Sequence, residues 1–253
     1  MNRGPKQFVY GSIFLTLAIS LIFGGYFLLV RPAPSCFDKR QNQGEEGVDC
    51  GGVCEQFCYP AVVKPITKTG DAKIFSIDER RSNVLVEVQN ANTSLAAKRF
   101  EYTLRFYGED GIQIDTVSGE SFIYAEEVKY VLYPSVSIPR RNINRVDFEV
   151  TNVEWASSEA FKKPNVSIQD QAVRVVGREI RVTGTVVNQD LRTLPNVEIV
   201  ALFYGTFRQI AGASRAEVEE VGVDERRQFT VIYPESSIIV PENAKVFVHA
   251  YRP

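Results

Sequence analysis

The hydrophobic and polar positions divide the chain into three regions. Residues 8–30 form a run of 23 residues without a charged side chain. As an α-helix rising about 1.5 Å per residue, this run spans about 35 Å and can cross a hydrocarbon core of about 30 Å. A polar segment with four cysteines follows at 31–60, and beyond it apolar residues recur in short alternating stretches. The pattern predicts a transmembrane helix at 8–30, a Cys-rich juxtamembrane segment at 31–60 and a β-rich remainder.

A cleaved signal peptide is the alternative interpretation of the apolar run. The apolar core of such a peptide is about 7–15 residues long and is followed by small residues at the cleavage site. Here the run is longer, ends in the bulky residues 27–30 and meets Arg31 directly. We therefore expect an uncleaved signal anchor.

The charges on either side of the apolar run predict its orientation. Arg3 and Lys6 precede it, whereas only Arg31 follows it closely. Because basic residues are retained on the cytoplasmic side, we expect a cytoplasmic tail at 1–7 and an extracytoplasmic remainder. The predicted location is the cell membrane, crossed once.

The β-rich remainder contains the same pattern twice, at a separation of about 98–100 residues. In each copy an alternating segment ends in an Asn-rich turn, a second segment ends in Tyr-Gly, a third ends in Tyr-Pro, and a fourth closes the copy. These segments are 84–93, 100–108, 130–134 and 145–150 in the first copy, and 180–190, 197–205, 229–234 and 245–250 in the second. Repetition of order, spacing and turn residues predicts a duplicated domain.

Period-2 alternation assigns these segments to strands. Val84, Val86 and Val88 share one face, opposite Leu85 and its polar neighbours. Residues 211–221 also fit one or two helical turns, but the counterpart at 116–128 favours an extended conformation. About seven short strands in each copy indicate an immunoglobulin-like β-sandwich. We expect sandwich domains at 61–151 and 166–253, joined by a linker at 152–165.

The four cysteines predict two disulfides. Cys36, Cys50, Cys54 and Cys58 have the spacing C-x13-C-x3-C-x3-C. An even number of cysteines beside a membrane anchor is typical of an oxidising compartment, and three pairings are open. The alternative is a thiolate zinc or iron–sulfur site, but the spacing lacks the two C-x2-C pairs of zinc ribbons and the ferredoxin spacings.

Oxygen-bearing side chains between the cysteines suggest a calcium site. Asp38, Asn42, Glu45, Glu46 and Asp49 offer the hard oxygen ligands that calcium prefers. The alternative is that they are solvated turn residues bonded to their own backbone. No other cofactor is expected.

Two family resemblances rest on these segments. Residues 36–54 resemble a short motif of secreted and surface-anchored bacterial proteins, C-x-D-G-x-x-N-x-x-E-x-x-x-D-C-G-G-x-C, with Lys39 in place of its Gly. The Asn turn, the strand ending in Leu-x-x-Tyr or Leu-Phe-Tyr and the later Tyr-Pro resemble FxLYD-type domains and the related late-embryogenesis type-2 domains. That resemblance implies immunoglobulin-like sandwiches and an extracytoplasmic setting, and it implies no catalytic residues.

Composition narrows the functional classes. The chain has 44% hydrophobic and 24% charged residues, which excludes a disordered chain and a polytopic membrane protein. After residue 31 there are 26 basic and 31 acidic side chains, so nucleic acid is not an expected partner. The one histidine, His249, cannot support the usual nucleophilic triads. The carboxylate pairs Glu126-Glu127 and Glu219-Glu220 are expected on the solvated surface.

We therefore expect a non-catalytic binding or structural protein, such as an accessory subunit of a surface or secretion assembly. Its partners would be the membrane and an envelope protein or cell-wall component. Two alternatives are a cell-envelope enzyme acting through carboxylates, and a Cys-ligated metal or redox protein. Candidate binding residues are Tyr107 and Tyr204, because alternation puts each on the opposite face from the preceding Phe106 or Phe203.

Overall fold

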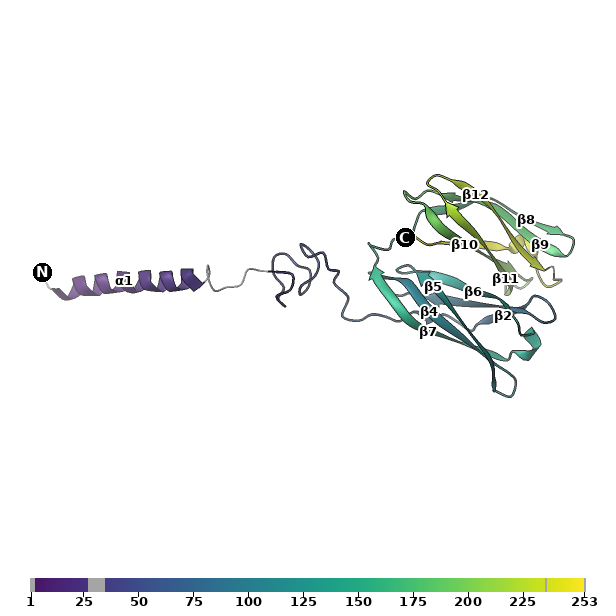
Figure 1. Cartoon of the computed structure of the whole chain (residues 1–253), viewed down its shortest axis with the longest axis horizontal. Coiled ribbons are helices and arrows are strands. Elements are labelled where there is room, and N and C mark those ends of the chain that lie inside the picture. Colours follow the sequence, from purple (N-terminus) through teal and green to yellow (C-terminus); the bar gives the residue numbers. More distant parts are fainter. Residues whose placement is uncertain (1–2, 27–34, 235, 253) are drawn as a thin grey trace. The chain divides into compact units, whose positions relative to one another are not determined.

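The computed structural model describes residues 3–26, 35–234 and 236–252 (Figure 1). The chain forms two compact units, Met1–Pro60 and Ala61–Pro253, and each is described by itself.

The first unit begins with helix α1 (Arg3–Gly25). Within the described residues, one helical stretch is long and apolar enough to cross a membrane, Gln7–Gly25, and none of it is buried by the rest of the protein. Its large side chains are open to the surroundings, with Phe8 81% and Leu21 75% exposed. The predicted helix is confirmed over 8–25, and positions 27–30 of the predicted span lie outside the described residues.

The second unit contains two β-sandwiches, which we name the first module (61–157) and the second module (166–252). In the first module β3 pairs with β1, β2 and β6 in one sheet, and β4 pairs with β5 and β7 in the other. The elements are β1 (Thr67–Lys68), β2 (Lys73–Ser76), β3 (Ser82–Gln89), β4 (Leu95–Tyr107), β5 (Gln113–Ile123), β6 (Val128–Val136), the 3-10 turn η2 (Arg140–Asn142) and β7 (Arg145–Ser157).

The second module has equivalent pairings in the same order, with the single strand β8 in place of β1 and β2. Its sheets are β12-β9-β8 and β11-β10-β13, and all the pairings are antiparallel. The elements are β8 (Val166–Val176), β9 (Glu179–Asn188), β10 (Leu194–Tyr204), β11 (Ile210–Val221), β12 (Arg226–Pro234), η3 (Pro241–Asn243) and β13 (Lys245–Ala250). The mostly β, sandwich fold is confirmed, and the segment 211–221 is a strand rather than a helix.

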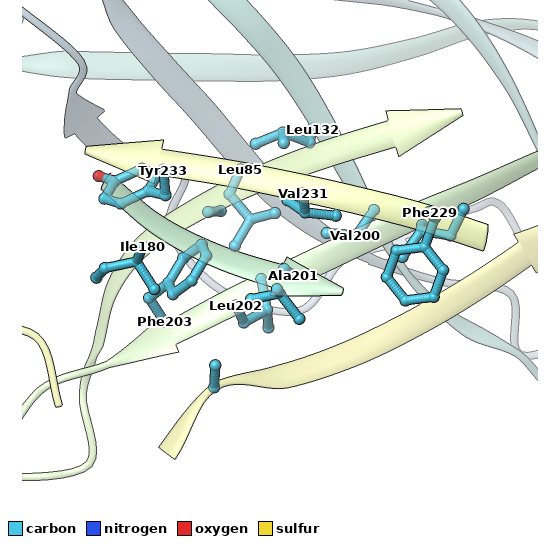
Figure 2. Packing of buried hydrophobic residues seen from close by; sticks show 14 of the residues in the cluster. Leu85, Leu132, Ile180, Val200, Ala201, Leu202, Phe203, Phe229, Val231 and Tyr233 are labelled. Carbon is cyan, nitrogen blue, oxygen red and sulfur yellow. The ribbon is translucent and has the colours of Figure 1, made fainter. Parts of the chain in front are cut away.

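Alternation along the strands builds the core of each module. Val84, Val86 and Val88 are at most 1% exposed and face the side chains of β4 across the first sandwich. The opposite face of β3 carries Leu85, which is also buried but packs with the core of the second module, as does Leu132 of β6. Figure 2 shows these two leucines among side chains of the second module. The core of the second module therefore includes these outer-face residues of the first, whereas the inner face of the first module forms a separate core.

The connection between the modules is shorter than the sequence predicted. Strand β7 continues to Ser157, so residues 152–157 of the expected linker, including Trp155, belong to the first module. Phe161 in the remaining connection is buried against Tyr124 and Tyr251, with ring centroids 4.7 and 5.5 Å away. The linker is therefore packed against both modules.

Candidate functional site

The Cys-rich segment is held by two disulfides, as the cysteine pattern predicted. The bonds join Cys36 to Cys54 and Cys50 to Cys58. No cysteine among the described residues is free, and these are all four cysteines of the chain. A thiolate metal centre is therefore not formed in this structure.

Carboxylates of the segment bind backbone N–H groups. Asp38 accepts hydrogen bonds from the backbone N of Arg40 and from Asn42 Nδ2, both at 2.9 Å. The hydrogen bond from Asn42 is the largest cause that holds the pKa of Asp38 below its usual value. Asp49 accepts the backbone N–H of Lys39 at 2.9 Å. Lys39 has φ of 59°, the left-handed region that favours glycine.

Glu45 is the buried carboxylate of this segment. It is 7% exposed and accepts the backbone N–H of Asn42 at 3.1 Å and of Asp49 at 3.3 Å. Its Oε1 lies 3.1 Å from Cys54 Sγ. Cys36, Glu45 and Cys54 form the one group of metal-ligand type found in the described part of the chain. Because its two sulfurs are bonded to each other, they carry no thiolate charge for a cation.

The calcium site stays a prediction. Glu45 is not grouped with the other predicted carboxylates as a set of converging ligands within the described residues. Three of these side chains instead accept backbone hydrogen bonds, as the alternative interpretation expected. The predicted ligands were Asp38, Asn42, Glu45, Glu46 and Asp49.

Tyr107 and Tyr204 occupy equivalent ends of β4 and β10. Both are half-buried, whereas Phe106 and Phe203 beside them are fully buried, as alternation predicted. The Arg145 guanidinium lies 4.3 Å from the centroid of the Tyr107 ring. The Lys245 Nζ lies 5.5 Å from the centroid of the Tyr204 ring. The two tyrosines are thus at the surface, each beneath a cationic side chain.

A cleft of about 540 Å³ lies where the two modules meet. Residues of β5 and β6 line one side, and these are edge strands of the two sheets of the first module. Residues of β10, β11 and β13 of the second module close the opposite side. The second module therefore covers an opening at the side of the first sandwich.

Lys129 is the most buried charged residue in this cleft. It lies opposite Val88 in the β3–β6 pairing, so alternation directs it inward, and its side chain is 1% exposed. Its Nζ lies 3.5 Å from the centroid of the Phe122 ring and 3.8 Å from Glu198 Oε2. The Nζ has no hydrogen-bond partner among the described residues. Burial lowers the pKa of Lys129 to about 8.

The carboxylate of Glu127 is buried beside the cleft, next to Lys163 of the linker and His249 of β13. Its Oε1 is 2.6 Å from Lys163 Nζ, and its Oε2 accepts the backbone N–H of Tyr124 at 2.9 Å. Burial raises the pKa of Glu127, but the neighbouring His249, Lys163 and the Tyr124 N–H outweigh it and lower the pKa to about 2. The prediction of a solvated Glu126-Glu127 pair was therefore wrong for Glu127, since the linker supplies Lys163 as its partner.

His249 is buried at 5% exposure on β13. Its Nδ1 lies 3.8 Å from Glu127 Oε1, too far for a hydrogen bond, and neither ring nitrogen has a partner in the described residues. Burial lowers the pKa of His249, more strongly than Glu127 raises it, so the imidazole is neutral at pH 7. His249 is thus a packed residue of the cleft wall.

Glu198 on β10 completes the charged cluster. Its Oε1 lies 3.1 Å from Arg215 Nη1, and the Glu198 side chain is 16% exposed. Glu127 and Glu198 therefore each lie closer to another cation than to Lys129 or His249, since Lys163 is 2.6 Å from Glu127 and Arg215 is 3.1 Å from Glu198. Neither predicted carboxylate pair, Glu126-Glu127 or Glu219-Glu220, lines the cleft.

The sequence did not identify Lys129, Glu198 or Arg215 as site residues. One signal was present, because Lys129 alternates with Val131 and Tyr133 on the inward face of β6. A lysine in such a series is expected at a strand end, where its ammonium reaches water. Here Phe122 of the same module and residues of the second module bury it.

Comparison with known proteins gives no family for this chain. No family model matches it, and no curated protein matches it. Among solved structures, red sea bream transglutaminase aligns at 9% identity and a TM-score of 0.22, over 72% of this chain and 29% of that one. The secreted serine protease VesC from Vibrio cholerae aligns at 7% identity and a TM-score of 0.16, over 71% and 50%. The chain spans half or less of either protein, and similarities this low carry no argument about function.

Proposed function

We propose that this protein is a single-pass envelope protein, anchored by α1 in the cytoplasmic membrane. Its two modules act outside the cytoplasm as a non-catalytic binding or structural subunit. The observation that carries this proposal is the uncovered apolar surface of Gln7–Gly25 in a chain that also holds two disulfides. An apolar surface of this size needs a cover, and a bilayer supplies one of matching length. The disulfides favour an oxidising compartment.

We also infer that the modules are a tandem duplication with the FxLYD-type pattern. The support comes from a buried asparagine at the same place in each, Asn90 and Asn188, both 0% exposed. The Nδ2 of Asn90 donates to the carbonyls of Leu95 and Tyr124, which ties the end of β3 to β4 and β5.

In the second module the Nδ2 of Asn188 donates to the carbonyls of Arg192, Val221 and Gly222, at 2.9 to 3.0 Å. These bonds tie β9 to the start of β10 and the end of β11. The asparagine of the resemblance is therefore a clamp between sheets, and this structural use explains why both copies contain it.

The partner surface that we favour lies beside Tyr204, at one end of the second module. Two loops meet there, because the backbone N–H of Val240 donates to Tyr204 O at 2.9 Å and Gly205 forms a bridge with Ile239. These loops expose Phe207 at 89% and Ile238 at 57%. Exposed aromatic and aliphatic side chains on adjoining loops suit an envelope protein or a cell-wall component as partner.

The topology part of the proposal is tested with protease on intact spheroplasts. We expect digestion of the modules without detergent, and labelling of the four cysteines by an impermeant thiol reagent only after reduction. Full protection of the modules until the membrane is dissolved would reject the extracytoplasmic assignment. Release of the protein from the membrane by carbonate would show that α1 is not a membrane anchor.

The partner part is tested by cross-linking and co-purification from solubilised membranes with Phe207→Ser. The matched control is Leu191→Ser, because Leu191 is equally exposed at 88% but lies on the β9–β10 loop. We expect Phe207→Ser to reduce the recovery of a reproducible partner, with little change in melting temperature, and Leu191→Ser to leave it unchanged. Equal recovery with both variants would show that this end of the module is not the partner surface.

A further inference from the structure

Lys129 is a buried cation without a hydrogen-bonded counter-ion. Glu127 is engaged by Lys163 at 2.6 Å and Glu198 by Arg215 at 3.1 Å, whereas the closest carboxylate oxygen to Lys129 Nζ is 3.8 Å away. An ammonium group has three N–H donors and no acceptor, so each unsatisfied donor in a buried site is unfavourable. An acceptor that enters the cleft would satisfy these donors.

The fold does not require a cation at this position. In the second module the position with the same register is Arg227, which lies opposite Val186 as Lys129 lies opposite Val88. The Arg227 side chain is 49% exposed and pairs with Glu225 at the surface. Burial of Lys129 is therefore specific to the cleft, and an uncompensated buried charge of this kind is typical of a binding site.

The walls around Lys129 are aromatic. Phe122 packs edge-on against Tyr251 of the second module, with ring centroids 5.4 Å apart, and both residues line the cleft together with Tyr102. A cleft of about 540 Å³ is within the range of small-molecule sites, about 300–1,000 Å³. It therefore offers an apolar surface beside the buried Lys129, whereas Arg99 and Arg215 of the same lining are paired with Glu120 and Glu198.

The charges at the cleft also limit the ligand. Four carboxylates line it, those of Glu120, Glu154, Glu198 and Glu217, against the four basic side chains of Lys98, Arg99, Lys129 and Arg215, so the lining has no net positive charge to hold a group with two negative charges. A single carboxylate requires only the one cation that Lys129 provides. Its two oxygens can accept from the ammonium, and such charge-assisted bonds are strong in a site that excludes water.

We propose that this cleft binds a small organic monocarboxylate, with the carboxylate on Lys129 Nζ and an apolar ring or chain against Phe122 and Tyr251. The ligand would contact both modules, so binding would also strengthen their association. This site is separate from the loops around Phe207 and does not depend on the membrane anchor. It adds a small-molecule ligand to the proposed envelope function.

The test uses the full chain in nanodiscs and measures binding by calorimetry. The probes are benzoate, cyclohexanecarboxylate and 3-phenylpropionate, with the corresponding amides as neutral analogues and inorganic phosphate as a different anion. The variants are Lys129→Met and, as the matched control, Lys68→Met on the exposed strand β1. We expect saturable binding of at least one carboxylate, weakened about tenfold or more by Lys129→Met or by conversion to the amide, and unchanged by Lys68→Met.

Any of the following results would overturn the proposal. One is the absence of saturable binding of all three carboxylates at concentrations up to about 10 mM, a limit that corresponds to very weak affinity. Another is equal binding of a carboxylate and its amide by the unmodified chain, a comparison that needs no variant to fold. The third is equal affinity in Lys129→Met, or phosphate binding tighter than that of the carboxylates. None of these results bears on the membrane anchor, which the protease experiment tests separately.

Discussion

The two modules have the same strand order, but they differ on the outer face of one sheet. In the first module Leu85 and Leu132 lie opposite each other on β3 and β6 and are 2% and 1% exposed. The pair with the same register in the second module is Thr183 and Thr230, and both are exposed. The first module thus has two apolar faces on this sheet, and the second module has one. Strand alternation builds each sandwich, whereas the polarity of its outer face decides whether it docks.

The docked face also contains directional bonds that the exposed face lacks. Asn83 is 4% exposed, and its Nδ2 donates to Ala213 O of the second module at 2.9 Å, while its Oδ1 accepts the backbone N–H of Ser135. Tyr124 Oη donates to Ala250 O at 2.8 Å. Buried hydrogen bonds of this kind fix one relative orientation of the two modules, because each would be left unsatisfied in any other.

The largest expected effect comes from a comparison of two variants, each with an aspartate on the outer face of one module. We expect Leu132→Asp to lower the free energy of unfolding by about 4 kcal/mol or more, since it buries an unpaired carboxylate between the modules. Thr230→Asp, at the same register position, should cost less than about 1 kcal/mol because its side chain stays in water.

Urea unfolding of the two full-length variants measures this contrast. If Leu132→Asp prevents folding, Leu132→Ala supplies the same comparison with an expected loss of about 3 kcal/mol, against little change for Thr230→Ala. Similar losses at both positions would mean that the outer face of the first module is not a docking face.

The second prediction concerns a feature that the modules share. Replacing Asn90 or Asn188 with Ala removes buried hydrogen bonds to two or three carbonyls and leaves those acceptors unsatisfied. We expect each substitution to cost about 3 kcal/mol, and the two costs to be similar. Urea unfolding measures both. Loss at one site only would show that the clamp stabilises one module alone and would weaken the inference of a duplicated domain.

The sequence predicted the strands, their inner faces and the two disulfides, because these depend on local alternation and on residue type. It did not predict the docked face, since Leu85 and Leu132 become neighbours only through the β3–β6 pairing. It also misaligned the Tyr-Pro segments. Tyr133 lies opposite Val84, but the equivalent Val182 lies opposite Val231 rather than Tyr233. The β3–β6 pairing is regular from Gln89–Val128 to Val84–Tyr133, so the two Tyr-Pro motifs lie at register positions two residues apart, which spacing alone does not reveal.

The candidate site could not be predicted from the sequence for a related reason. Lys129 and Arg227 are both basic residues near the start of a strand, and each would be expected to extend into water. Their environments differ because Phe122 of the first module and Glu198, Arg215 and His249 of the second surround Lys129. A site formed between two modules has no compact motif, since its residues come from distant strands.

A third prediction uses pH to distinguish Lys129 from Arg227. With a folded pKa of about 8 against 10.5 in the unfolded chain, the unfolded state binds the extra proton between these values, so stability rises with pH in this window. Removing the buried ammonium should make Lys129→Met more stable than the parent at about pH 7.5. That advantage should shrink by about 2 kcal/mol by about pH 10.

The matched control is Arg227→Met, whose difference from the parent should not change over the same range. Buried tyrosines with raised pKa values, Tyr102, Tyr124 and Tyr233, act in the opposite direction above about pH 10. Their contribution cancels when each variant is compared with the parent at the same pH. A constant difference for Lys129→Met would mean that its ammonium is hydrated in solution.

The smallest expected effect lies at the strand ends, where the modules are most alike. Tyr107 lies beneath Arg145 at 4.3 Å, and Tyr204 lies beneath Lys245 at 5.5 Å. Cation–π contacts at exposed sites contribute about 0.5–1 kcal/mol and weaken with distance, so the coupling should be larger in the first module. Two double-mutant cycles measure the couplings, one with Tyr107→Leu and Arg145→Met and the other with Tyr204→Leu and Lys245→Met.

Arg145 also pairs with Asp147 at 3.2 Å, and this contact holds the guanidinium in place over the ring. A larger coupling at Tyr204 would show that the mobility of the cation, and not its distance, controls the contact. In that case a half-buried tyrosine could bind a partner only if the cation over its ring moves away.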